Sequence, residues 1–155
     1  SMLDKLISND NFCDFMYNNA KETVAFLLQN NVEFGVICNT SEVIFEPALP
    51  QEILKNIKPI ALFVLSNYSF ESAYMDENGE NLYFEAGFGP ENFASTVSID
   101  ISNVIQIIVE DTPIFINVCA GRKKLVKKPE MKKVETENRS MEKLLSRPEN
   151  QKFLK

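Results

Sequence analysis

Apolar residues recur every three or four positions from residue 12 to residue 28, a spacing that places them on one broad face of a helix. Ser8 or Asp10 can cap the start of this helix near Asn11. Two asparagines at positions 30 and 31 end it, because asparagine accepts left-handed backbone angles. The pattern therefore predicts one N-terminal helix.

The apolar face of this helix must be covered by something. Packing on the rest of the domain is one expectation. Pairing with a second copy of the chain is the other, because a small domain with an apolar terminal helix often forms a dimer. The candidate residues for such a dimer interface lie in the first turns, at Phe12, Phe15 and Met16.

Beyond residue 31 the pattern changes to short apolar or alternating runs that are separated by proline, glycine, asparagine and aspartate. The run at 60–65 is apolar on both faces, which predicts a central, buried strand. One helix followed by about eight strands predicts a mainly β fold, a small β-barrel or sandwich. The expected strands cover residues 32–38, 42–45, 60–65, 68–74, 82–88, 94–99, 104–110 and 114–118.

Charge divides the chain in two. Residues 1–121 hold 4 basic and 17 acidic side chains, a net charge of −13, whereas residues 122–155 hold 12 basic and 5 acidic ones, a net charge of +7. We therefore expect a helix plus β-barrel domain over residues 8–121 and a flexible, disordered basic tail over residues 122–155. The apolar pair near the end of the tail is either a docking motif or an incidental end.

The residue types argue against an enzyme and against a bound cofactor. The chain has no histidine, which removes the usual general base and most metal ligands, and no catalytic constellation is visible. Cys13, Cys38 and Cys119 are odd in number and lie among apolar residues, so we expect buried free thiols in a reducing cytoplasm. No apolar run approaches the roughly 18 residues that span a membrane.

The stretch from residue 82 to residue 89 is the best candidate for binding. Its glycines would allow another backbone to approach the sheet closely, as a bound extended peptide does, although a tight turn explains them equally well. RNA binding is the alternative for a small barrel with exposed aromatic residues. An acidic domain repels phosphate, so RNA could be attracted only by the basic tail.

Four segments of the chain, in order, resemble segments of one known protein family, and the likeness spans residues 24–115. The run AFLLQNNV at 25–32 is similar to the end of that family's first helix, and IALFVL at 60–65 to its central strand. LYFEAGFG at 82–89 resembles its Phe-x-Ala-x-Phe-Gly segment, and VSIDISNV at 97–104 its Val-Ser-Val-Pro-x-x-x-Val segment. The family that these segments resemble is stringent starvation protein B, the adaptors that deliver tagged substrates to the bacterial protease ClpXP.

This resemblance implies an Sm-like barrel preceded by a dimer-forming helix, in the bacterial cytoplasm. It also implies that an extended degradation tag, the ssrA tag, binds in an apolar groove. The matching groove positions are Leu65, Ser66, Ala86, Gly87 and Phe88. The family's tail ends in a basic and apolar motif that docks on ClpX, which is matched here by Arg147, Pro148, Lys152, Phe153, Leu154 and Lys155. We therefore predict a non-enzymatic protease adaptor, with an RNA-binding barrel as the alternative.

Overall fold

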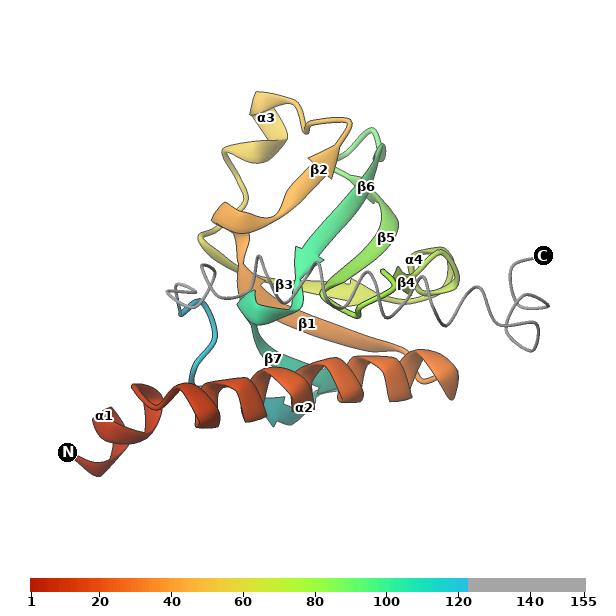
Figure 1. The fold of residues 1–155 in the computed structure, drawn as a ribbon. Helices are drawn as coiled ribbons and strands as arrows, with labels where there is room; N and C mark the ends of the chain where they lie inside the picture. The colour runs from red at the N-terminus through yellow and green to blue at the C-terminus, as the bar shows by residue number, and fades with distance from the viewer. Residues whose placement is uncertain (123–155) are drawn as a thin grey trace, which may run out of the picture. The chain divides into compact units, whose positions relative to one another are not determined.

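The computed structural model describes residues 1–122, which form a compact unit from Ser1 to Arg122 (Figure 1). This unit is mainly β, with few helices, and its strands form two antiparallel sheets. The first sheet has the order β3-β1-β7-β8 and the second has the order β2-β6-β5-β4. The prediction of a mainly β fold that follows an N-terminal helical segment is confirmed.

The N-terminal segment contains two helices where the sequence predicted one. A short α1 (Met2–Ile7) precedes the long α2 (Asp10–Gln29). Asn9, not Ser8 or Asp10, caps α2, because its side-chain oxygen accepts a hydrogen bond of 2.9 Å from the N–H of Phe12. The helix ends where predicted, since Asn31 has a left-handed φ of 56°.

In the first sheet, β1 pairs antiparallel with β3 on one side and with β7 on the other. Its strands are β1 (Phe34–Asn39), β3 (Ile60–Leu65), β7 (Val104–Val109) and β8 (Thr112–Ile116). Alternate side chains of β1, from Phe34 to Cys38, face the core, as the two-residue period of a strand requires. The helix α2 packs on β7 and buries Ala20, Val24 and Leu27 (Figure 1).

The second sheet contains the two longest strands. Its strands are β2 (Ile44–Glu46), β4 (Tyr74–Met75), β5 (Asn81–Phe88) and β6 (Phe93–Asp100). β5 pairs with β6 along its whole length, from Asn81 opposite Asp100 to Phe88 opposite Phe93. The turn before β5 is held by Asp76, whose carboxylate accepts hydrogen bonds from the N–H groups of Glu80 and Asn81 at 2.7 and 3.0 Å.

Two single turns of 3₁₀-helix carry the chain from one sheet to the other. η1 (Thr40–Glu42) joins β1 to β2, and η2 (Ile101–Asn103) joins β6 to β7. The core lies between the sheets and combines residues of both, such as Val36 and Ile107 from the first with Leu82 and Val97 from the second.

The strand predicted at 60–65 is present, but its predicted central position is wrong, and the strand predicted at 68–74 is wrong as well. β3 lies at an edge of its sheet and is not central, and its outward side chains remain about half exposed: Ile60 at 58%, Leu62 at 49% and Val64 at 59%. Residues 68–74 do not form one strand. They form α4 (Tyr68–Glu71) and the start of β4, and another helix of four residues, α3 (Gln51–Leu54), precedes β3.

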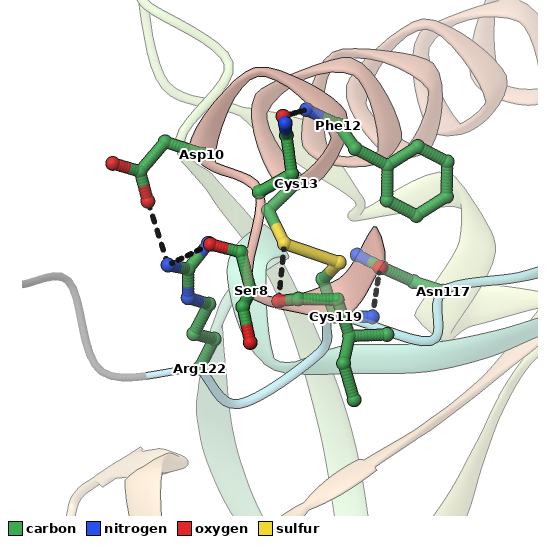
Figure 2. The surroundings of a disulfide bond; sticks show 9 residues. Ser8, Asp10, Phe12, Cys13, Asn117, Cys119 and Arg122 are labelled. Atoms are coloured by element: carbon green, nitrogen blue, oxygen red, sulfur yellow. Dashed lines mark hydrogen bonds and ion pairs between the residues drawn. A yellow bond between two sulfur atoms is a disulfide. The ribbon is translucent and has the colours of Figure 1, made fainter. Parts of the chain in front are cut away.

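The expectation of three free thiols is also wrong. Cys13 of α2 and Cys119, which follows β8, form a disulfide with their Cα atoms 5.5 Å apart (Figure 2). Beside it, the guanidinium of Arg122 contacts the Asp10 carboxylate at 2.6 Å and donates to the Ser8 carbonyl at 3.2 Å. Cys38 alone is a buried free thiol, as expected, and its burial raises its pKa to about 12.

Candidate functional site

The predicted peptide-binding residues lie at the ends of two strands. Leu65 is the last residue of β3 and is fully buried in the core, while the half-buried Ser66 follows it. Ala86, Gly87 and Phe88 form the end of β5. The two strands meet inside the protein, where Phe63 of β3 lies edge-on to Phe84 of β5 with ring centroids 6.3 Å apart.

The edge of β5 that faces away from β6 is only partly covered. β4 pairs with Tyr83 and Leu82 alone. One step further along, the N–H of Glu85 donates a hydrogen bond of 2.9 Å to the hydroxyl of Ser72. Because alternate N–H groups of a strand point the same way, the N–H of Gly87 points to this edge too. Gly87 is exposed, and no strand among residues 1–122 pairs with it there.

The short helix α4 lies between the ends of β3 and β5. It begins after Asn67, which takes a left-handed φ of 52° and donates its N–H to the Glu33 carboxylate at 2.7 Å. The hydroxyl of Ser69 accepts from the N–H of Ser66 at 2.9 Å. Phe70 packs edge-on against Phe34. These contacts fix α4 where the sequence placed a strand, and α4 contacts both β3 and β5.

A cavity of about 420 Å³ opens where α4 meets the second sheet. Tyr68 and Glu71 of α4 form one side, and Glu85 of β5 and Thr96 of β6 form another. Its remaining lining residues are Ser72, Tyr74 and Phe84. Glu85 directly precedes the predicted binding residues 86–88, so the cavity borders the uncovered edge of β5.

Tyr68 and Glu85, which both line this cavity, are joined by a hydrogen bond from the phenol to the carboxylate. This bond, and the negative charge of Glu85, raise the pKa of Tyr68 above its usual value. Tyr74 stacks on Tyr83 with ring centroids 5.0 Å apart. The cavity thus combines aromatic faces with carboxylates, and sequence reasoning had assigned it no part in binding.

Gly87 has a reason to be glycine that lies within the protein itself. A Cβ atom at this position would overlap the side-chain amide of Asn92, which comes from the turn between β5 and β6. Asn92 has a left-handed φ of 56°, and Gly89 in the same turn has a φ of 74°. The tight-turn explanation that the sequence left open therefore accounts for Gly87 without a ligand.

Ala86 and Phe88 face the space between the sheets. Phe88 lies edge-on to Phe45 of β2 with ring centroids 5.5 Å apart, and Phe45 in turn lies 6.3 Å from Phe63. Ala86 is half-buried against the core. The end of β5 therefore offers a ligand its backbone and a partly apolar rim.

The predicted dimer residues lie on the first half of α2. Phe15 is 58% exposed, while Phe12 and Met16 are half-buried. Phe12 and Phe15 contact each other with ring centroids 6.5 Å apart. Phe26, which sequence reasoning did not select, is 62% exposed. Its spacing of eleven residues from Phe15 is three helical turns, which places both rings on the same face of α2. That spacing is the signal that would have found it.

The predicted docking residues, from Arg147 to Lys155, lie outside the described residues. Within residues 1–122, no helix has the length and apolar character that crossing a membrane demands. The same residues contain no group of three histidine, cysteine, aspartate or glutamate side chains placed to hold a metal ion. Neither a family model nor a protein of curated function matches the sequence.

Proposed function

We propose that this protein is a non-enzymatic adaptor for proteolysis, which binds an extended degradation tag and brings the tagged substrate to the ClpX unfoldase of ClpXP. The observation that carries the proposal is the edge of β5 at residues 86–88, which no strand among residues 1–122 covers. An extended peptide can add to such an edge through main-chain hydrogen bonds.

The proposed tag lies along β5 and pairs with the N–H and C=O groups of Gly87. Ala86 and Phe88 supply an apolar rim, and the end of β3 with Ser66 forms the far wall beyond α4. Main-chain pairing gives affinity, while pockets beside the strand give sequence preference. The two corners at η1 and η2, where strands pass from one sheet to the other, support the Sm-like barrel that the resemblance implies.

The basic tail tethers the substrate in this proposal. Its docking motif at residues 147–148 and 152–155 binds ClpX, so a captured substrate stays at high effective concentration near the unfoldase. Pairing of two copies through Phe12, Phe15 and Met16 would supply two tails and thus avidity. The exposed rings of Phe15 and Phe26 favour such a pairing, because large apolar side chains gathered on one face mark interaction sites.

We place this activity in the bacterial cytoplasm, where ClpXP acts. The Cys13–Cys119 disulfide weighs against this location, because cytoplasmic thiols are normally kept reduced. A measurement of the redox state of these cysteines in protein alkylated at the moment of cell lysis decides the point.

Fluorescence anisotropy with a labelled ssrA-tag peptide tests peptide binding by the full-length chain. We expect micromolar binding, and loss of binding when alternate peptide nitrogens are methylated, since methylation removes the main-chain donors that pair with β5. Methylation of the other set of alternate nitrogens is the matched control. Equal binding of all three peptides would contradict strand addition.

A variant in the tail separates ClpX binding from peptide binding. Replacing Phe153 and Leu154 with serine in the full-length chain should abolish ClpX binding and leave peptide binding intact. If the chain bound no peptide and instead bound RNA in a strongly salt-dependent way, the RNA-binding alternative would replace the adaptor.

A further inference from the structure

The cavity beside α4 contains chemistry that main-chain pairing on β5 does not use. Two carboxylates, those of Glu71 and Glu85, line it together with the rings of Tyr68 and Tyr74. We propose that this cavity takes the cationic head of an arginine side chain from the bound peptide, so the recognised tag is selected for a basic residue. The inference rests on the proposed peptide binding and deepens it.

The charge of the cavity is uncompensated within residues 1–122. No lysine or arginine lines it, and neither Glu71 nor Glu85 forms an ion pair within the part of the chain that the structure describes. Tyr68 uses a single acceptor site of Glu85, and a carboxylate has about four. Glu85 therefore keeps the capacity to accept further hydrogen bonds from a guanidinium.

The aromatic walls favour a cation for a second, independent reason. Tyr68 is 63% and Tyr74 56% exposed, so each presents part of its ring to a ligand. A cation over the face of an aromatic ring is attracted by the ring's negative quadrupole. The stacking of Tyr74 on Tyr83 holds one of these rings in place.

Arginine fits these walls better than lysine. Its planar guanidinium can bind a carboxylate with two parallel hydrogen bonds and can stack on a tyrosine ring at the same time. An acidic side chain would meet two carboxylates in this cavity and would be rejected. The cavity's volume lies within the range of about 300–1,000 Å³ that small-ligand sites occupy, so a single long side chain enters it readily.

The position of the cavity links it to the strand edge. Glu85 contributes both its carboxylate to the cavity and its N–H to the edge, where Ser72 holds it. A peptide that pairs with Gly87 therefore passes the mouth of the cavity within two residues along β5. The peptide side chain that enters the cavity belongs to the residue next to the one paired with Gly87, on the side of Glu85.

The test compares two labelled peptides of alternating threonine and alanine, one with a central arginine and one with citrulline, which has the same shape without the charge. We expect the full-length chain to bind the arginine peptide about threefold to tenfold more tightly. This preference should vanish in Glu71→Gln/Glu85→Gln. It should persist in Glu42→Gln/Glu46→Gln, which removes the same charge from exposed positions outside the cavity.

N-acetyl-arginine methylamide, followed by NMR, separates this inference from the proposed function. Shifts of the Tyr68 and Tyr74 ring signals with this probe, absent with the citrulline analogue, support the cavity even if neither peptide binds. Equal binding of the two peptides overturns the arginine site and leaves peptide binding standing. Absence of binding by both peptides and by the amide overturns the arginine site, whereas the proposed function is overturned when the ssrA-tag peptide also fails to bind.

Discussion

Two regions of the protein are stabilised in different ways. One is the junction of α2 with the segment after β8, and the other is the region around α4. The junction is closed by the Cys13–Cys119 disulfide and by the contacts of Arg122 with Asp10 and Ser8. The region around α4 is held without a covalent bond, by hydrogen bonds such as those from Glu85 to Ser72 and from Ser66 to Ser69 and by the packing of Phe70 on Phe34. It is also where a strand edge remains uncovered and the cavity opens.

This difference separates stability from binding. Covalent closure restricts the unfolded chain and stabilises the whole unit, whichever ligand is bound. A region held by a few hydrogen bonds opens locally at low cost, and binding surfaces are commonly drawn from such regions. Changes at the junction should therefore alter the unfolding of the whole unit without altering binding, and changes around α4 should have smaller, local effects on stability.

The largest effect is expected from removing the disulfide. Cys13→Ser/Cys119→Ser should lower the free energy of unfolding by about 3 kcal/mol, because the bond closes a long loop of the unfolded chain. Urea denaturation under non-reducing conditions measures it. Each single Cys→Ser variant should lose as much, since either removes the bond. Peptide affinity should stay unchanged. A double variant as stable as the parent protein would show that the junction contributes no more to stability than the region around α4.

A smaller effect is expected at α4. Ser72→Ala removes the acceptor of the Glu85 N–H and should lower the free energy of opening the region around α4 by about 1 kcal/mol. Amide hydrogen exchange should accelerate at Glu85 more than at core positions such as Val97. Ser98→Ala, on the neighbouring strand β6, is the matched control and should change neither quantity. Uniform acceleration across the protein would show that α4 unfolds only with the whole domain.

The smallest effect concerns the titration of Tyr68. Its pKa is raised in the folded protein by the hydrogen bond to Glu85 and by that carboxylate's charge. The stabilisation by this bond is therefore present below the ordinary tyrosine pKa of about 10, and it is lost as the pH rises through the raised value. NMR of the tyrosine rings should show Tyr68 ionising late, and Glu85→Gln should return it to the ordinary range.

The strands were predictable from sequence because their pattern is strong. Alternation of apolar and polar residues defines β5 and β6, and the valines and isoleucines of β7 define the strand that α2 covers. Residues 68–74 were wrongly predicted to form a strand, because a helix of four residues is too short to show a helical period. Its position depends on tertiary contacts such as the one between Phe70 and Phe34.

The cavity and the disulfide could not be predicted, because both arise from residues that are distant in sequence. Glu71 and Glu85 belong to different elements, and only the fold of α4 onto β5 brings them to one cavity. Three cysteines allow three pairings, and nothing local selects Cys13 and Cys119, which lie 106 residues apart. The exposed apolar face of β3 was misjudged for a similar reason. An apolar run alone does not distinguish an edge strand from a central one.

The disulfide also determines how the domain carries mechanical load. Cys119 comes just after β8, so a pull on the chain beyond Arg122 reaches the bond to Cys13 before it reaches that strand. The load passes into α2, and β8 cannot be peeled from its sheet one residue at a time. While the bond is intact, a motor that pulls from the C-terminus meets a closed covalent loop and must take in more than one segment of chain at once.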